Sequence, residues 1–443
     1  MATRCAVPLV SRAEYKNRKV NLKAILGQVN DGGYSPSKLH GFLSTPKQNS
    51  VARFVPVFTY SDTAVYFACM QTVDKSLAAK AIPSTFGGWQ LGGARRSMEE
   101  REALQMFGGE DSLSIPQSCY NRAAWIRYWN QFWKLLAAQH EHADEHAWFA
   151  MFDIANFYDS IDLCRLENSV RAESAGFQFP INVLFHLLRT WNKAHCLYSE
   201  STKGLPMDVV GDCSRLLANF YLTTFDAEFR DQIAGDEGEY MRFADDMVVR
   251  GRTEKMCREF VYRASEALHR LGLNINVAKV KYCSKKEFDQ YWGFVIMDRF
   301  ESGQLLEGLG LLRTFITKDD FGRKTTALKR AISLVSRTED PEAKWWKEWV
   351  REAAFEEAVP LQLSREQLIS FIRLYDDPTV AMQRLVPLFL DQPFSQPKAV
   401  FLRAMDYPMA NGNMLLKEAK QNVVERIKGL HDPVLDLCAA GCG

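Results

Sequence analysis

Two apolar segments that run directly into acidic residues constrain the fold of this chain more than any other feature. The first, residues 148–152, is followed by Asp153, and the second, residues 240–250, carries Asp245 and Asp246 at its centre. Short apolar runs of this kind predict buried strands, and the second run predicts a hairpin with both acids at its turn. A buried acid is costly unless it is paired. We therefore expect the two segments to be neighbours in one sheet.

Three carboxylates at one edge of a sheet predict a cation site. Like charges that share a site repel one another unless a cation neutralises them. Mg²⁺ suits such a site because it prefers oxygen ligands and completes its shell with water and substrate phosphates. Two ions ~4 Å apart would hold the attacking 3′-oxygen and the leaving pyrophosphate of an in-line phosphoryl transfer.

A second pair of adjacent acids, Asp376 and Asp377, shows that such a pair alone is weak evidence. Pro378 follows directly, and residues 378–390 have a helical pattern. Asp before a proline that opens a helix predicts an N-cap. We therefore assign no catalytic role to this pair.

The rest of the sequence indicates an α+β protein with more than one domain. Its 443 residues, 47% hydrophobic and 25% charged, are enough for more than one core. An aromatic helix is expected over residues 121–138, and Ser364 with Gln367 predicts a capping box. Beyond residue 305 we expect helices, at 324–335, 342–358, 364–374, 378–390 and 415–430.

Charge, cysteines and hydropathy exclude several classes of protein. The net charge is +1, so attraction to phosphates has to come from local patches. The ten cysteines form no Cys-x-x-Cys pair, which favours reduced thiols in the cytoplasm. Basic residues interrupt the start of the chain before a signal-peptide core can form, and no apolar run is long enough to span a membrane.

Five segments resemble, in order, the motifs of reverse transcriptases. Residues 153–161 resemble the first palm motif, and residues 243–246 resemble the aromatic-x-Asp-Asp box. The other matching segments are residues 204–206 leading to 214–222, residues 271–279 and residues 291–294, the last of which resembles the primer grip. The resemblance implies a right-hand polymerase: fingers over 1–145, a palm with an antiparallel sheet over 146–300, and a helical thumb or C-terminal domain over 301–443.

The same resemblance implies an RNA-directed DNA polymerase that uses two Mg²⁺ ions, with Mn²⁺ as a substitute. Its partners would be an RNA template, deoxynucleotides and the DNA product. No RNase H, zinc-finger or His-Asn-His motif follows residue 300. A compact polymerase with a helical extension resembles the abortive-infection and defence-associated reverse transcriptases of bacteria. That group implies anti-phage defence, a dedicated non-coding RNA and a homo-oligomer.

The resemblance also implies roles for individual residues. Asp153 and Asp245 would bind both ions, the Ile154 carbonyl would complete one shell, and Asp246 would play a weaker part. The residues expected to bind the incoming nucleotide are Lys47, Arg53, Tyr158 and Lys279. The residues expected at the template and primer are Gly204, Pro206, Ser214, Asn219, Trp292 and Gly293.

Tyr158, five residues after Asp153, bears on the choice of sugar. In this fold that position faces the sugar of the incoming nucleotide, and a flat ring there would crowd a ribose 2′-hydroxyl. Ala244, where RNA-copying RNA polymerases typically carry glycine, points the same way. Both favour a DNA product, although packing in the core would also explain Tyr158.

The link between Met207 and Cys213 is longer than in many relatives and carries Asp208 and Asp212. It keeps open template-independent or protein-primed DNA synthesis. A catalytically inactive RNA-binding module is a more remote alternative. Trp345, Trp346 and Trp349 have the spacing of a helix core. A basic set could line a duplex channel: Lys318, Arg323, Lys324, Lys329 and Arg330.

Overall fold

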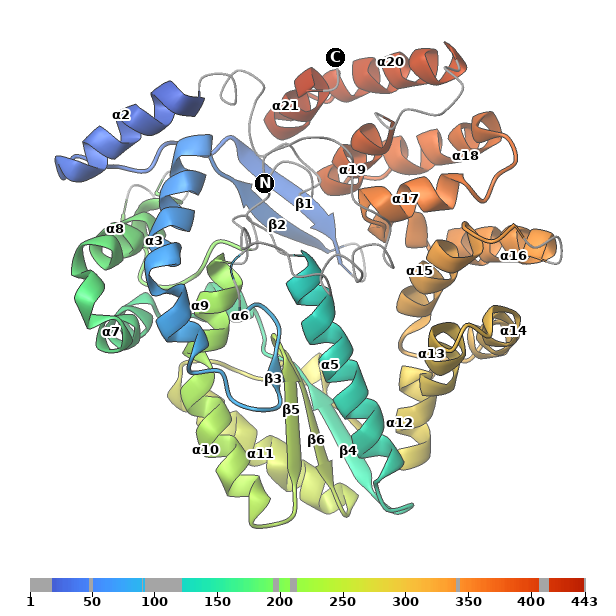
Figure 1. Cartoon of the computed structure of the whole chain (residues 1–443), viewed down its shortest axis with the longest axis horizontal. Helices are drawn as coiled ribbons and strands as arrows, with labels where there is room; N and C mark the ends of the chain where they lie inside the picture. Colours follow the sequence, from blue (N-terminus) through green and yellow to red (C-terminus); the bar gives the residue numbers. More distant parts are fainter. Residues whose placement is uncertain are drawn as a thin grey trace.

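The computed structural model describes residues 18–47, 51–89, 91, 122–193, 199–207, 213–339, 343–405 and 414–441. In Figure 1 a twisted sheet flanked by helices occupies the lower half of the molecule, a small hairpin lies above it, and helices form the right-hand and upper parts. The expected α+β class, with an all-helical C-terminal part, is confirmed.

The main sheet has five strands and contains both acid-bearing segments. Its order is β3 (Thr85–Phe86), β5 (Glu239–Phe243), β6 (Asp246–Gly251), β4 (Trp148–Phe152) and β7 (Lys281–Ser284). All pairs are antiparallel except the parallel pair β3–β5. Because β4 pairs with β6, with Phe152 opposite Met247, Asp153 emerges beside the hairpin turn. The predicted neighbourhood of the two segments is thus confirmed.

Both faces of the sheet are buried, which explains why its strands are almost continuously apolar. Phe149 and Met151 point to the face covered by α5 (Arg122–Glu141), whereas Ala150 and Phe152 point to the core on the other face. This alternation is the two-residue period of a strand. The other face is covered by α10 (Thr223–Ala234) and α11 (Glu254–Arg270).

Two elements of the predicted fingers, residues 1–145, join this sheet. β3 pairs with β5, and α5 places Trp129 and Phe132 against Phe243, with ring centroids 5.0 and 5.6 Å apart. Only contact with the strand of a distant segment buries the apolar face of α5. The boundary at residue 145 stays a prediction, but the palm sheet draws on residues before it.

The other fingers elements form a hairpin and part of a helical layer, whose remaining helices belong to the predicted palm, residues 146–300. β1 (Gly41–Pro46) and β2 (Ala52–Val57) pair antiparallel, and α3 (Tyr60–Ala78) follows them. The α3 helix begins at Thr59, whose side chain accepts a hydrogen bond from the Asp62 amide. The other elements of this layer are α2 (Arg18–Asn30), α6 (Phe157–Ser160), α7 (Leu163–Glu173), η2 (Ala175–Phe177), α8 (Gln178–Thr190) and α9 (Cys213–Tyr221).

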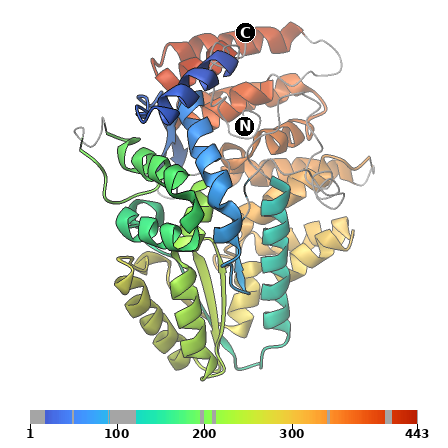
Figure 2. The same cartoon turned by 60° about the vertical axis from the view of Figure 1, so that its left-hand side comes forward.

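The C-terminal part is helical and returns to the fingers hairpin, as the rotated view in Figure 2 also shows. The Ser44 amide on β1 donates to Ser395 Oγ at 2.9 Å. The elements are η3 (Val277–Lys279), α12 (Lys285–Trp292), α13 (Phe294–Glu301), α14 (Leu305–Phe315), α15 (Lys324–Val335), α16 (Ala343–Glu356), η4 (Val359–Gln362), α17 (Arg365–Ile372), α18 (Pro378–Asp391), α19 (Ser395–Met405), α20 (Met414–Lys428) and α21 (Pro433–Gly441).

Local helix signals from the sequence are confirmed. Ser364 and Gln367 form the predicted capping box at the start of α17. Asp377 caps α18 by accepting a hydrogen bond from the Thr379 amide, so the second acidic pair is a helix cap. The tryptophan prediction is right in part: Trp346 and Trp349 pack against the core, but Trp345 is 48% exposed.

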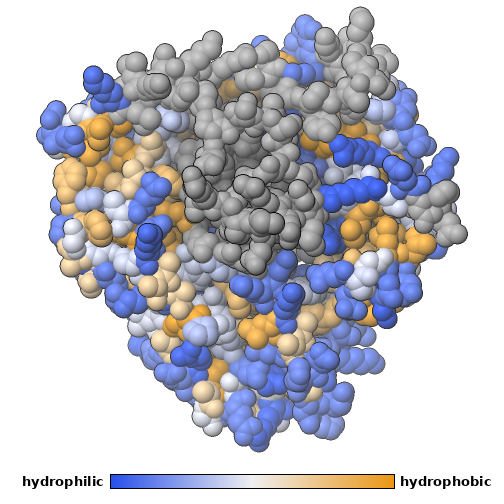
Figure 3. Space-filling model, in the orientation of Figure 1, coloured by the Kyte–Doolittle hydropathy of each residue, from blue (hydrophilic) through white to orange (hydrophobic). Residues whose placement is uncertain are grey.

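The surface carries separate apolar patches among charged residues. In Figure 3 hydrophilic residues cover most of the lower half of the face shown, with apolar patches between them. Within the described residues, none of the helices combines the length and the apolar character that a bilayer crossing requires.

Candidate active site

The acids Asp245 and Asp246 lie at a two-residue hairpin turn whose backbone is held on both sides. Phe243 pairs with Asp246, so Ala244 and Asp245 form the turn. Ala244 has a φ of +55°, in the left-handed region that favours glycine. Its amide donates to the Phe86 carbonyl at 3.1 Å, and its carbonyl accepts from Arg242 Nη1 at 2.6 Å. These two bonds fix a turn that alanine alone would not favour.

Arg242 is fully buried and belongs to a hydrogen-bond network under this turn. It forms an ion pair with Asp226 on α10, with Nη2–Oδ2 at 2.5 Å and Nε–Oδ1 at 2.9 Å. Its Nη1 also donates to Asn219 Oδ1 at 2.7 Å, and Tyr240 donates its hydroxyl to Asp226. Burial lowers the pKa of Arg242, but the Asp226 carboxylate more than compensates, so the net pKa is raised. A buried pair is tolerable only with such complete hydrogen bonding.

No motif in the sequence points to this network. One signal was available, because Arg242 interrupts an otherwise apolar strand. A charged residue inside a strand that is buried on both faces requires a buried counter-charge. The sequence does not identify Asp226 as the partner, because Asp226 lies on an amphipathic helix, α10, where acidic residues are common.

Asp153 is buried at 4% exposure directly after β4, and a neighbouring segment holds it. Its backbone carbonyl accepts from the Asn276 amide at 2.8 Å, and Ile154 forms a β-bridge with Ile275. Lys279 forms an ion pair with Oδ2 of Asp153. Oδ1 is buried and has no hydrogen-bond partner among the described residues. In Asp153, Oδ2 is therefore neutralised by Lys279, whereas Oδ1 accepts no hydrogen bond from any described residue.

The acids of the turn share an environment that disfavours negative charge. Burial and the charges of Asp246 and Asp153 together raise the pKa of Asp245 to about 6, whereas Arg53 opposes the shift. Burial by the surrounding protein also raises the pKa of Asp246, although the residue keeps some exposed surface. The charges of Arg323 and Lys279 oppose that shift. Three carboxylates in mutual repulsion are suited to accept a cation.

The same acids do not form a closed metal cage. In the described part of the chain, no group of three or more His, Cys, Asp or Glu side chains is arranged to hold a metal ion. The oxygen donors nevertheless fit a hard divalent cation. Oδ1 of Asp153 has no hydrogen-bond partner among the described residues, and Oδ2 already attracts one cation, the Lys279 ammonium. The metal assignment to Asp153, Ile154, Asp245 and Asp246 therefore stays a prediction.

We expect replacement of Asp245 by asparagine to stabilise the metal-free protein above pH 6. A carboxyl whose folded pKa is raised contributes stability below its unfolded pKa and loses it as the pH rises through the folded value. The ionised group therefore costs stability at pH 8, and asparagine removes that cost, which we put at about 3 kcal/mol. Thermal unfolding in EDTA should show a higher Tm for Asp245→Asn at pH 8 and an equal Tm near pH 4. An equal difference at both pH values would contradict the repulsion.

The fingers hairpin brings two predicted nucleotide-binding residues to these acids. Lys47 directly follows β1 and is exposed, and Arg53 lies on β2 opposite Thr45. Burial lowers the pKa of Lys47, as do the charges of Arg53 and Lys279, whereas Asp245 and Asp153 raise it. Lys47, Arg53 and Lys279 thus form a cationic group beside Asp153 and Asp245.

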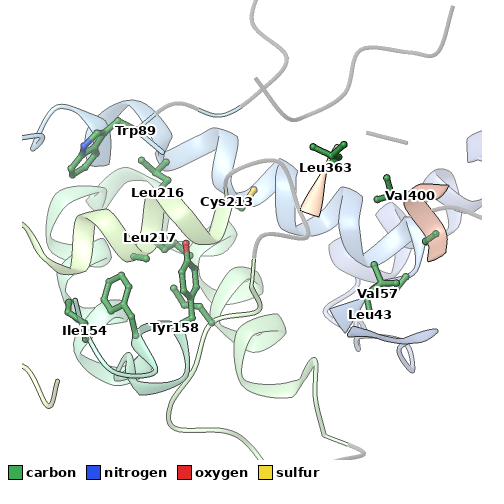
Figure 4. Packing of buried hydrophobic residues seen from close by; sticks show 14 of the residues in the cluster. Leu43, Val57, Trp89, Ile154, Tyr158, Cys213, Leu216, Leu217, Leu363 and Val400 are labelled. Atoms are coloured by element: carbon green, nitrogen blue, oxygen red, sulfur yellow. The ribbon is translucent and has the colours of Figure 1, made fainter. Parts of the chain in front are cut away.

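Tyr158, the fourth predicted nucleotide-binding residue, packs mainly in the core. It lies on α6 with 9% of its surface exposed. Figure 4 shows its ring beside Leu217 of α9, in the same cluster as Cys213 and Leu216. Core packing, left open by the sequence, is thus confirmed, and contact with the sugar stays a prediction.

Residues of the second motif hold the fold together rather than line a surface. Gly204 has a φ of +98° and donates its amide to the Ile161 carbonyl at 2.9 Å. Ser214 donates its hydroxyl to the Pro206 carbonyl, and it also shares a hydrogen bond of 2.9 Å with the Tyr66 hydroxyl. Ser214 is only 2% exposed, so its side chain supports the surrounding backbone, and its expected place at the template and primer stays a prediction. Residues 208–212, including Asp208 and Asp212, lie outside the described part.

Asn219 and Trp292 are buried in the same way. Asn219 is 2% exposed and connects the Gly87 carbonyl to Arg242. Trp292 is 2% exposed and packs against α5, with its ring 5.5 Å from that of Trp133. Gly293, with a φ of +62°, ends α12 and precedes α13. The Asn219 and Trp292 side chains thus position the residues around them, and the expected place of Asn219, Trp292 and Gly293 at the template and primer stays a prediction.

Comparison with known proteins adds a family to this geometry. Residues 106–296 match the family model described as reverse transcriptase (RNA-dependent DNA polymerase). No curated protein matches the chain.

Two solved structures of telomerase are similar to the chain. Apo telomerase from Candida tropicalis shares 10% identity over 95% of this chain and 76% of its own, with a TM-score of 0.35. Telomerase from Candida albicans in complex with the TWJ fragment of telomeric RNA shares 7% identity over 89% and 72%, with a TM-score of 0.34. No conclusion is drawn from these two structures, because their TM-scores and identities are low. The conclusion that follows comes from the family match. The chain carries a reverse-transcriptase domain, and it is therefore an RNA-directed DNA polymerase, a nucleotidyltransferase.

Proposed function

We propose that the chain copies RNA into DNA at the edge of the sheet where β4 ends and the β5–β6 turn begins. The observation that carries this proposal is that Asp153 lies beside the acids of the turn and next to the cationic group defined above. Oδ1 of Asp153 has no hydrogen-bond partner among the described residues. Phosphoryl transfer needs both features, acids for divalent cations and cations for the triphosphate. Asp153 and Asp245 are the main Mg²⁺ ligands in this proposal, the Ile154 carbonyl completes one shell, and Asp246 is the weaker ligand.

The acids and the cations of the site have different roles in the proposed reaction. Bound Mg²⁺ would supply positive charge at the transferring phosphate, and Mn²⁺ would serve as a substitute. Lys47 and Arg53 bind and neutralise the triphosphate, with arginine offering a bidentate contact. Burial lowers the pKa of Lys279, but Asp153 and the other acids raise it to a net increase, so Lys279 stays protonated. It can therefore steady the triphosphate or give a proton to the leaving pyrophosphate.

We expect Tyr158→Ala to relax discrimination against ribonucleotides. The Tyr158 hydroxyphenyl ring stands at the position that would crowd a 2′-hydroxyl, and alanine would remove the obstacle. The ratio of kcat/KM for deoxy- and ribonucleotides should fall by roughly tenfold. Because the ring is also packed against α9, some loss of Tm is expected, so the ratio and not the rate is the readout. An unchanged ratio would leave Tyr158 with its core role alone.

The biological role that we propose is anti-phage defence in the bacterial cytoplasm with a dedicated non-coding RNA. Support comes from the helices α14 to α21, which follow the palm sheet as in the defence-associated enzymes. A homo-oligomer is part of this proposal.

The test is to purify the protein with its co-isolating nucleic acid and supply Mg²⁺ with labelled deoxynucleotides. We expect products whose sequence is complementary to the bound RNA or to an added RNA template. Homopolymer or repeat products that are independent of the template would replace this proposal with template-independent synthesis. Loss of the labelled product after protease treatment would reveal a protein primer. Absence of incorporation with every template would overturn the proposed activity.

A further inference from the structure

The outer edge of the fingers hairpin is joined to the C-terminal helices by a pair of serines. β1 pairs with a strand on one side only, so some of its backbone amides point away from β2. The Ser44 amide donates to Ser395 Oγ at 2.9 Å, and the Ser395 amide donates to Ser44 Oγ at 2.8 Å. The two hydroxyls share a further hydrogen bond of 3.1 Å. Two residues that are 351 positions apart are thus bonded in both directions.

Each serine satisfies a backbone group of the other's element. Ser395 is the first residue of α19, where the backbone amides have no acceptor inside the helix. A side chain close in sequence usually supplies that acceptor, whereas here Ser44 supplies it from β1. Ser395 is only 3% exposed. Because an unsatisfied buried amide is costly, the pair favours this one placement of α19 on β1.

Apolar packing beside the serine pair holds the hairpin to the same helices. Leu43 and Val57 are buried in one cluster with Val400 of α19, as Figure 4 shows. Gly41 has a φ of +151°, and a Cβ on it would lie 2.8 Å from Cγ2 of Val434 on α21. Besides β2, α19 and α21 are the main partners of β1 among the described elements, and Figure 1 shows them beside the hairpin. The hairpin therefore rests on the C-terminal helices.

The serine pair is close, in the register of the hairpin, to two of the predicted nucleotide-binding residues. Ser44 directly precedes Thr45, which lies opposite Arg53 on β2. Lys47 comes three residues after Ser44, a distance of ~10 Å along an extended chain. Because β1 and β2 are paired over their whole length, a shift of β1 at Ser44 moves both cations.

We infer that Ser395 is a positioning residue for the incoming nucleotide. Through Ser44 it holds β1 in place, and it so keeps Lys47 and Arg53 at the triphosphate. This inference rests on the proposed polymerase function, and it gives the C-terminal helices a part in nucleotide binding. The serine pair acts through the cations and not through the acids. Its loss therefore weakens nucleotide binding and leaves the chemical step unchanged.

The test measures the affinity for dGTP with Mg²⁺, without primer or template, by isothermal titration calorimetry. Ser395→Ala removes the acceptor of the Ser44 amide and changes no charge. We expect the Kd for dGTP to rise about fivefold, the usual size of one lost hydrogen bond. In primer extension, kcat at saturating nucleotide should stay within about twofold of the wild type. Deuterium exchange of the amides of residues 41–47 should become roughly tenfold faster. Ser44→Ala, which removes the other acceptor, should have the same effects.

Ser333→Ala is the matched control. Ser333 is also buried in the helical part, but its hydroxyl donates to the Lys329 carbonyl at 3.1 Å within α15. This variant should leave the Kd, kcat and exchange at their wild-type values. If Ser395→Ala left the Kd unchanged, even with faster exchange, or lowered kcat as much as the affinity, the inference would be overturned. Titration without primer requires no catalysis, so a wild-type protein that binds dGTP but incorporates nothing would sink the polymerase proposal alone.

Discussion

Asp153→Asn is expected to reduce deoxynucleotide incorporation by roughly 10³-fold or more while the protein stays folded. Asparagine has nearly the same shape as aspartate but carries no charge. It therefore removes the charge of the proposed metal ligand, whose Oδ1 has no hydrogen-bond partner among the described residues, and it also releases Lys279 from its ion pair. The measurement is primer extension on an RNA template in Mg²⁺, with circular dichroism to establish that secondary structure is retained.

The second acidic pair of the chain supplies the control for this variant. Asp377→Asn makes the same chemical change at a helix cap, where asparagine caps about as well as aspartate. It should leave both incorporation and Tm near the wild-type values. If Asp153→Asn retained more than about a tenth of the activity, a difference of only 1.4 kcal/mol in the barrier, Asp153 would not be a principal metal ligand.

The parts of the fold that the sequence predicted are those that local pattern determines. The apolar run of residues 148–152 identified β4, and apolar flanks around Asp245 identified the hairpin. Ser364 with Gln367 and Asp377 with Pro378 fixed the starts of α17 and α18, because capping depends on side chains within one turn. Lys47 and Arg53 were predicted by resemblance. In the structure the β1–β2 hairpin holds both residues, and it lies near enough to the acids for their charges to interact.

What the sequence could not predict depends on contacts between distant segments. Neither β3 nor the covering role of α5 follows from local pattern, since both need β5 as a partner. The burial of Asn219 and Trp292 could not be predicted, because a motif marks a position but does not say whether its side chain points inward. Arg323, at the start of α15, lies over the Trp129 ring of α5 and the Trp292 ring of α12, and no periodicity relates three such segments.

The buried pair Arg242–Asp226 gives the second large expected effect. Arg242→Met would leave the Asp226 carboxylate buried without its counter-charge, which typically costs 3–5 kcal/mol, about the scale of a large core defect. It would also remove the donor to the Ala244 carbonyl, so the turn that carries Asp245 and Asp246 would lose one of its two anchors. We expect a marked fall in the midpoint of urea unfolding together with a loss of incorporation.

A second variant separates stability from positioning. In Arg242→Met with Asp226→Asn the buried charge is gone, while the Tyr240 hydroxyl keeps an acceptor oxygen at position 226. Stability should therefore recover substantially, because a neutral buried group costs less than an unpaired charge. Incorporation should stay low, and the fall should lie in kcat more than in the KM for nucleotides, since the Ala244 carbonyl still lacks its donor and Lys47 and Arg53 are untouched. Recovery of both stability and kcat would mean that Arg242 only stabilises the palm. Recovery of stability alone would show that the ion pair, invisible in any short motif, sets the conformation of the turn on which the three acids depend.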